Sequence, residues 1–461
     1  MIRLLIARAS NTNLIATARA LRYTKNAKNH EHKTNIFDHS RSRGKKMKSA
    51  SRWKMPQEVD ELGQHSVEEK HRSKVREYEK AGKEVISFFA SNPPREGFQN
   101  KTLNGALIEA ARGDTEGYPQ LTTLFSDLRE AISRFEEKLR NIKCSPENIL
   151  IGPGAAGCFN SFHYANLEEG DEVLAFDPEH YIAGPSSYLY TFGSKLVTCR
   201  TIEDENWQPD LEDLRAKITS KTKVIVMCNP NNPVGYVWDE KTLKRIVDIA
   251  GEYKIPILSD EMYGLITFDG IKANSIVNVA GDVPAITLTG MSKFFMRPGW
   301  RIGYMGFHDP EGVITEMIET TKKVAVTYGH PTLCIPTPIV YAAVKAYQNY
   351  KGAFNAGKEM VKETQKHRDF TWKRLNEIDG ITCTKPEGSL YAFPKISNIG
   401  KKWKTDIEFQ LELLKAEGVT WTTGRRYGKF GYGHMRVLLQ PKLERLEEAF
   451  NKLERFLTRH T

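Results

Sequence analysis

The amino-acid sequence predicts an α/β protein: a mostly parallel sheet covered by helices on both faces, together with a smaller α+β domain. Two observations support the sheet. Apolar runs alternate with helical stretches between residues 120 and 310, and each run stops at a glycine, a proline or an acidic residue. Apolar strands separated by helices are typical of parallel sheets buried on both faces. A third observation supports the smaller domain, because beyond residue 335 the periodicity is mainly helical around one β-like stretch, "GSLYAFPKI".

We expect four parts in the chain, whose 461 residues are enough for two sizeable cores. Residues 1–48 are expected to form a basic leader, and residues 49–95 a linker with the N-terminal segment of the small domain. Residues 96–335 should form the large domain and residues 336–461 the C-terminal small domain.

The leader carries all of the net charge of +10. Residues 1–50 hold 12 Lys and Arg against 2 Asp and Glu, whereas the rest of the chain holds 55 of each sign. No acid precedes Glu31, and apolar residues recur at helical spacing among the basic ones. This composition is typical of a mitochondrial transit peptide. We therefore expect a protein of the mitochondrial matrix. It would be cytoplasmic if the leader is a disordered extension, or lies upstream of a true start at Met47.

Several classes of protein are excluded by composition. No apolar run approaches the roughly 18 residues of a membrane span, so no transmembrane segment is expected. The rest of the chain is electrically balanced, so the net basic charge that could indicate nucleic-acid binding belongs to the leader alone. Six cysteines are scattered without Cys-x-x-Cys pairs or histidine clusters, which predicts reduced thiols and no metal site; they are Cys144, Cys158, Cys199, Cys228, Cys334 and Cys383.

The expected elements follow in order along the chain. A short strand should form in "EVISFFASNPP" and end at a proline-rich turn. Five apolar runs should form strands of the large sheet: "ENILIGPGAAG", "DEVLAFDPEHY", "KVIVMCNPNNPVG", "IPILSDEMYG" and "AITLTGMSK". "EKTLKRIVDIAGEY" places Leu243, Ile246, Val247 and Ala250 on one face of an amphipathic helix. The closing helix has its own apolar face, made of Leu443, Leu446, Phe450, Leu453 and Leu457.

Unusual residues stand at four of these strand ends, where ligands bind in open α/β sheets. The turn at 152–157 either lets backbone N–H groups approach a phosphate or is a tight packing turn. The loop "NPNNPVG" at 229–235 has two Asn-Pro pairs, which make it rigid enough to aim an amide inward. Asp260 is either a buried acid that needs a cation or a helix N-cap. Lys293 is either a surface lysine or a reactive amine.

Together the strand ends supply a phosphate turn, an amide, an acid, a phenol, an amine and the guanidinium of Arg301. Pyridoxal 5'-phosphate needs these groups: an amine for its aldehyde, a carboxylate for its ring nitrogen, and donors for its phosphate and phenolic oxygen. The order Gly-rich turn, Asn-Pro-x-x-Pro-x-Gly, Asp-x-x-Tyr, Ser-Lys-x7-Arg-x-Gly and a late arginine resembles fold type I aminotransferases of the class I/II group. The resemblance covers about residues 65–460, and "PDLEDLRAKITSKTKVIVMCNPNNPVG" resembles the alanine transaminase branch most closely.

The resemblance implies cofactor roles for the residues at the matching positions. Lys293 would be the Schiff-base lysine and the general base, and Arg301 would hold the cofactor phosphate. Asp260 would pair with the pyridinium nitrogen. Asn232 and Tyr263 would hydrogen-bond the phenolic oxygen.

Further positions are implied in the same way. Gly154, Ala155 and Ala156 would form the phosphate loop, and Ser292 would also bind the cofactor. Tyr118, in "EGYPQL", would reach a phosphate across a dimer interface.

Two neighbouring residues are candidates for stacking on the cofactor ring, and three further residues are implied to bind the substrate. Tyr181 is expected to stack on the cofactor ring, and His180 is the alternative because the local spacing is longer than usual. Arg436, in "GHMRVLL", would clamp the substrate α-carboxylate, with Asn232 and Ser91 beside it.

The implied activity is transfer of an amino group from an L-amino acid to a 2-oxo acid by a ping-pong mechanism. Alanine is the expected donor and 2-oxoglutarate a suitable acceptor. Both are small molecules, and a homodimer is implied. "GHPTLCIPTP" lacks an arginine that the alanine branch carries, so donors of the aspartate, aromatic or kynurenine type stay open. A carbon–sulfur β-lyase is a further alternative, as is a cofactor-binding regulator that uses the basic leader on DNA.

Overall fold

We describe the fold from a computed structural model, which covers residues 63–89, 91–113, 117, 123–326 and 335–460. All of these residues belong to one compact unit that spans residues 56–461. The predicted leader lies outside the described residues, as do Tyr118, Cys334 and the segment near residue 332 that lacks an arginine.

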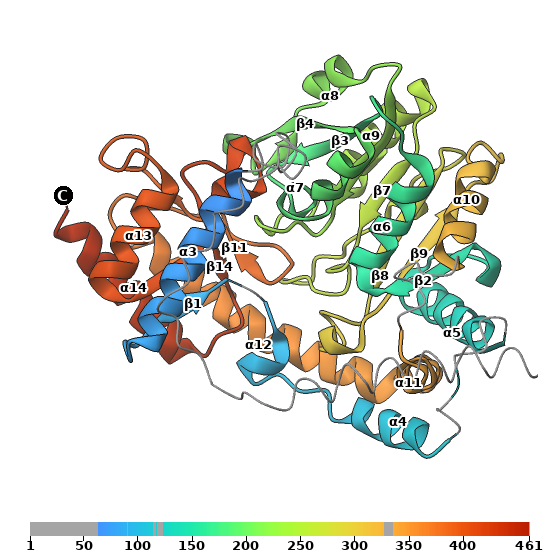
Figure 1. The fold of residues 1–461 in the computed structure, drawn as a ribbon, viewed down its shortest axis with the longest axis horizontal. Helices are drawn as coiled ribbons and strands as arrows, with labels where there is room; N and C mark the ends of the chain where they lie inside the picture. The colour runs from blue at the N-terminus through green and yellow to red at the C-terminus, as the bar shows by residue number, and fades with distance from the viewer. Residues whose placement is uncertain (1–62, 90, 114–116, 118–122, 327–334, 461) are drawn as a thin grey trace, which may run out of the picture. The chain divides into compact units, whose positions relative to one another are not determined.

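The large sheet has eight strands in the order β2-β9-β8-β7-β6-β3-β4-β5. Its central strands are β3 (Glu172–Asp177), β6 (Thr222–Cys228), β7 (Ile257–Asp260) and β8 (Ala285–Gly290), and neighbours among them pair in parallel. β4 (Lys195–Ile202) extends the parallel part, and β5 (Gln208–Pro209) closes that edge antiparallel. β9 (Ile302–His308) runs antiparallel between β8 and β2 (Ile149–Pro153). The prediction of a mostly parallel sheet is confirmed (Figure 1).

Successive side chains of the central strands point to opposite faces of the sheet, and each face is covered by its own hydrophobic core. Both sets of side chains are buried, which explains why these runs are apolar throughout. Val173 and Val226 pack on one face of the sheet with α6 (Gly154–Asn166) and α10 (Thr315–Val326). Leu174 and Ile225 pack on the other face with α9 (Glu240–Tyr253). The amphipathic helix predicted over 240–253 is confirmed, because its four apolar positions are all buried.

A second sheet has the order β1-β13-β14-β11 and joins segments far apart in the sequence (Figure 1). β1 (Ile86–Phe88) pairs in parallel with β13 (Val419–Thr423). β14 (Met435–Leu438) runs antiparallel to both β13 and β11 (Tyr391–Ala392).

Helices complete the packing around the second sheet. α3 (Gly63–Lys80), α13 (Asp406–Glu417) and α14 (Leu443–Thr458) lie beside it (Figure 1). α4 (Thr102–Ala111), α5 (Thr123–Arg140) and α11 (Thr337–Gln348) pack together. α12 (Tyr350–Asn376) extends from the second sheet, where it contacts β11 and α14, toward α11 and α4 (Figure 1). The predicted apolar face of α14 is confirmed for four of its five positions, and Leu443 at the helix start is half-buried.

Two expected absences can be examined on the described residues alone. Within them, no helix is both long and apolar enough to cross a membrane. Their five cysteines are unpaired, and four of these are buried.

Candidate active site

The candidate site lies where four neighbouring strands of the large sheet end. β8, β7, β6 and β3 are parallel neighbours, so their carboxyl ends lie along one edge of the sheet. Asp260 is the last residue of β7, while Asn232 and Lys293 follow β6 and β8 within four residues. β14 of the second sheet brings Arg436 to the same place, because its guanidinium donates to the Asn232 side chain at 3.1 Å.

The amine of Lys293 points into this group of residues. Its Nζ donates to the Ser91 carbonyl oxygen at 3.1 Å, and the Ser91 hydroxyl donates to Gln440 at 2.9 Å. The positive charge of Lys293 helps to lower the pKa values of His180 and Tyr391 and partly opposes the burial that raises the pKa of Asp260, so the amine lies near all three. Lys293 therefore does not extend into solvent as a surface lysine would.

Asp260 is a buried acid and does not cap a helix. Its carboxylate accepts the backbone N–H of Met262 at 3.1 Å. Burial raises the pKa of Asp260 from 3.8 to about 7, and the adjacent Glu261 raises it further, while Met262 N–H and Lys293 partly oppose the rise. Among the described residues, no cation lies within salt-bridge distance of this carboxylate. The site therefore offers a buried anion to a positively charged partner.

A chain of polar contacts joins Arg436 to two phenols. The Asn232 amide donates to the Tyr263 hydroxyl at 3.5 Å, and that hydroxyl lies 3.0 Å from the Tyr391 hydroxyl. The Arg436 guanidinium lies over the Tyr391 ring at 4.3 Å and over the Tyr427 ring at 5.1 Å. It also donates to the Phe89 carbonyl at 2.7 Å. The Nε of Arg436 is buried without a hydrogen-bond partner, so one donor remains for an anion.

Arg301 lies against the start of α6 because it directly precedes β9, whose first residue, Ile302, pairs with Pro153 at the end of β2. Arg301 donates to the carbonyl oxygens of Pro298 and Pro153, at 3.0 and 3.1 Å. Gly154 has a φ of +77°, and a Cβ there would lie 2.4 Å from the Arg301 guanidinium, so only glycine fits. The first N–H groups of a helix lack partners within it, and here a guanidinium lies beside them. This arrangement is suited to an anion such as a phosphate.

The expectation that Tyr181 stacks on the cofactor needs correction. Tyr181 is buried in the core beneath the sheet, 5.4 Å from the Phe159 ring, and its hydroxyl lies 2.8 Å from His163. His180, the alternative, is on the site side: burial, then the charges of Arg436 and Lys293, lower its pKa to about 3. Its ring is therefore neutral, as stacking on a cofactor ring would require.

The other residues predicted to bind the cofactor differ in how deeply they are buried. Ser292 is buried, Ala155 is half-buried, and Ala156 is exposed on the first turn of α6. Two residues of the site were missed by sequence reasoning, namely Tyr391 and Tyr427. The signal for Tyr391 was its place in the β-like stretch "GSLYAFPKI", and that for Tyr427 was the glycine-rich loop before Arg436.

These residues fit pyridoxal phosphate on three observations. The backbone at Gly154 beside Arg301 is suited to a phosphate. The buried Asp260, without a cation among the described residues, suits a protonated ring nitrogen. An amine, Lys293, lies within the same group.

Comparisons with known proteins agree with this chemistry. Residues 84–453 match the family model described as aminotransferase class I and II. A glutamate-pyruvate aminotransferase of Haemophilus influenzae is 31% identical over 393 residues, which cover 84% of this chain and 94% of that protein. An aspartate aminotransferase of Pyrococcus abyssi is 34% identical over 72% of this chain and 82% of its own length. The solved alanine aminotransferase of Pyrococcus furiosus superposes with a TM-score of 0.77 at 38% identity, covering 84% of this chain and 95% of that one.

The family match spans most of the chain, and the solved relative shares its fold. The chain therefore belongs to the class I and II aminotransferases, and it is a pyridoxal phosphate-dependent aminotransferase of fold type I that resembles the alanine aminotransferases.

Proposed function

We propose that this aminotransferase takes the amino group from L-alanine and passes it to a 2-oxo acid such as 2-oxoglutarate. The observation that carries the proposal is the position of Arg436, whose guanidinium has an unpartnered buried Nε among Tyr391, Tyr427 and Asn232. A guanidinium is suited to binding a carboxylate through two hydrogen bonds. Support for alanine comes from the relatives named glutamate-pyruvate and alanine aminotransferases.

We propose the following roles for the chain's own groups. Pyridoxal phosphate, when bound, supplies an aldehyde that reacts with the amino group and a ring that draws electrons from the substrate Cα. Lys293 moves the proton at that carbon, because its amine is the base that the Ser91 carbonyl holds within the site. Asp260 keeps the proton on the ring nitrogen, and Arg436 fixes the substrate by its carboxylate.

The cofactor's remaining groups are assigned to donors nearby. Arg301 and the first turn of α6, from Gly154, hold the phosphate. Asn232 and Tyr263 donate to the phenolic oxygen, and the Tyr391 hydroxyl orients Tyr263 from 3.0 Å.

Aspartate or an aromatic amino acid is the second candidate donor. The aspartate aminotransferase of Pyrococcus abyssi and an aromatic-amino-acid aminotransferase of Thermococcus litoralis are 34% and 33% identical to this chain, as similar as the relatives named for alanine. Donor choice rests on a few pocket contacts, so identity at this level does not rank the donors.

A half-reaction screen tests the proposal. Each of the twenty amino acids is mixed with the enzyme without an oxo acid, and conversion of the bound cofactor to its amine form is followed by absorbance. L-alanine should convert it fastest, and 2-oxoglutarate should then restore the aldehyde form. Faster conversion by aspartate or an aromatic amino acid would replace alanine as donor. Catalytic release of ammonia and pyruvate from one amino acid alone would identify a lyase.

We further propose that residues 1–48 direct the protein to mitochondria and that the enzyme works as a homodimer in which Tyr118 reaches the partner's cofactor. The acid-poor, basic composition of the leader supports the first statement. A fluorescent protein fused behind residues 1–48 should enter mitochondria, and a diffuse signal would reject the leader.

Light scattering of the purified enzyme should give twice the chain mass of 52.4 kDa.

A further inference from the structure

A junction between the two sheets stands beside the candidate site. One side is the segment 177–180, where β3 ends. The other side is the segment 427–430, which connects β13 to β14. Three hydrogen bonds join them: Glu179 N–H donates to the Tyr427 carbonyl at 2.8 Å, and the N–H groups of Lys429 and Phe430 donate to the two oxygens of Asp177 at 3.0 and 3.1 Å.

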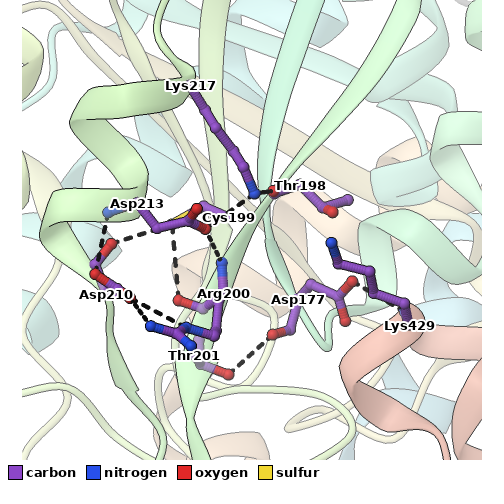
Figure 2. A network of polar contacts seen from close by, with 9 residues as sticks. All are labelled: Asp177, Thr198, Cys199, Arg200, Thr201, Asp210, Asp213, Lys217 and Lys429. Atoms are coloured by element: carbon purple, nitrogen blue, oxygen red, sulfur yellow. Dashed lines mark hydrogen bonds and ion pairs between the residues drawn. The ribbon is translucent and has the colours of Figure 1, made fainter.

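The fit at this junction is close on both sides. Asp177 is buried, and its own carbonyl accepts the Thr201 hydroxyl at 3.0 Å, which ties it to β4. Figure 2 shows the Asp177 carboxylate turned toward Lys429, away from the Arg200–Asp210 pair of the same sheet. Gly428 has a φ of +130°, and a Cβ there would lie 2.0 Å from the Asp177 carboxylate. No side chain fits at position 428 while the two N–H groups reach Asp177.

Each side of the junction carries residues of the site. His180 follows directly on the β3 side, and the Pro178 carbonyl accepts the Asn231 amide at 3.5 Å, next to Asn232. Tyr427 lies on the other side, with its ring 5.1 Å from the Arg436 guanidinium. The same loop leads into β14 and therefore sets where Arg436 enters the site. The junction thus holds groups from both sheets in one arrangement.

We propose that Asp177 is a positioning residue for substrate binding: by holding the 428–430 backbone, it fixes Tyr427 and Arg436 against the large sheet at the distance that the substrate carboxylate requires. This inference rests on the carboxylate role proposed for Arg436. Both oxygens of the Asp177 carboxylate already accept the backbone N–H groups of Lys429 and Phe430. Its effect reaches the reaction through the position of the guanidinium.

Two substitutions test the junction from opposite sides. Asp177→Asn replaces one acceptor by an NH2 donor facing a backbone N–H, so one of the two hydrogen bonds is lost. Gly428→Ala pushes the loop away from Asp177. Asp210→Asn is the matched control (Figure 2). Asp210 likewise accepts a backbone N–H, that of Asp213 in α8 (Leu211–Lys217), and a second donor, Arg200 of β4, but it makes no hydrogen bond to the second sheet.

The measurements are made on the cofactor-loaded enzyme with the amino acid and oxo acid that the wild type uses. They are KM for both substrates, kcat, the inhibition constant of propionate, the Kd for pyridoxal phosphate and the Tm. Asp177→Asn and Gly428→Ala should each raise both KM values and the propionate inhibition constant by about tenfold. The cofactor Kd should change by less than about twofold, as should every constant of Asp210→Asn. The double variant should be no worse than the poorer single variant, because both changes break one contact.

Three results would overturn the proposal: unchanged KM values in both variants, an equal effect in the Asp210 control, or additive effects in the double variant. If Tm shows that one variant is unfolded, the other still decides. Arg436→Lys separates this inference from the proposed function. If Arg436→Lys leaves propionate inhibition unchanged, the carboxylate role of Arg436 is wrong and the junction proposal falls with it. If only Arg436→Lys weakens inhibition, the junction proposal alone is wrong.

Discussion

Replacing Asp260 with asparagine should stabilise the cofactor-free protein, and the gain should grow with pH. Burial raises the pKa of Asp260 from 3.8 to about 7. Between these values the folded protein holds a proton that the unfolded chain has released, so stability falls as the pH rises through this window. Asparagine is uncharged in both states, and the variant therefore escapes this loss.

The size of the effect follows from the shift. Each pKa unit is worth about 1.4 kcal/mol, so a carboxylate ionised in this position costs the fold about 4 kcal/mol well above pH 7. Part of that cost is already present at pH 5, because the Asp260 carboxyl is ionised in the unfolded chain at this pH but still protonated in the folded protein. The stability gained by Asp260→Asn should therefore grow by about 2–3 kcal/mol between about pH 5 and pH 8.

Urea unfolding of the cofactor-free wild type and variant, at four pH values across this range, measures the difference. The difference also includes the titration of Glu179, whose pKa is raised by burial and then by the Asp260 charge, so the measured pH dependence belongs to the two carboxyls together. The same variant should lose transamination, because no carboxylate would remain to hold the proton on the cofactor ring. A stability difference that stays constant with pH, or shrinks as pH rises, would falsify the reasoning about this carboxyl.

Three further predictions concern single residues. Lys293→Ala should abolish both transamination and the visible absorbance of the bound cofactor, whereas the exposed Lys244→Ala should leave both unchanged; retention of both signals in the first variant would move the reactive amine elsewhere. Arg436→Ala should raise KM steeply for every accepted amino acid, since all share the α-carboxylate, and an effect on one donor only would contradict this. His180→Ala should shift the absorbance of the bound cofactor, while Tyr181→Phe should leave the spectrum intact and cost about 1 kcal/mol of stability through the lost bond to His163; the reverse pattern would return Tyr181 to the site.

Five strands of the large sheet, β2, β3, β6, β7 and β8, could be predicted because each is apolar on both faces and ends at a polar or bending residue. β4 has exposed and half-buried positions along most of its length and β5 has only two residues, so neither stood out. The ends of the predicted strands also located the site, since parallel neighbours bring Asn232, Asp260 and Lys293 to one edge. β9 was harder to foresee: it lies antiparallel inside an otherwise parallel region, between β2 and β8, and nothing in its residues marks its direction.

Other features depend on details that a single sequence does not display. His180 and Tyr181 are neighbours, and α7 (His180–Ala183), which begins at His180, turns one toward the site and the other into the core. Tyr391 lies on a two-residue strand whose pairing with β14 decides its place beside Arg436. The contacts of Asp177 with residues 429 and 430 span about 250 positions along the chain, beyond the reach of any local pattern.

The two adjacent acids of "SDEMY" show why burial by itself does not mark a functional carboxylate. Glu261 is as buried as Asp260, yet its oxygens pair with the Arg140 guanidinium and accept the Ser275 hydroxyl at 3.0 Å and the Ile276 N–H at 2.9 Å. Such a set satisfies the charge within the fold. Asp260 has one backbone N–H at 3.1 Å and, within the described residues, no salt bridge. A fold that leaves this anion uncompensated is less stable by itself, and the deficit is recovered only when a cation binds there. Asp260, which lacks such partners, is therefore better suited than Glu261 to pair with a positively charged group of a ligand.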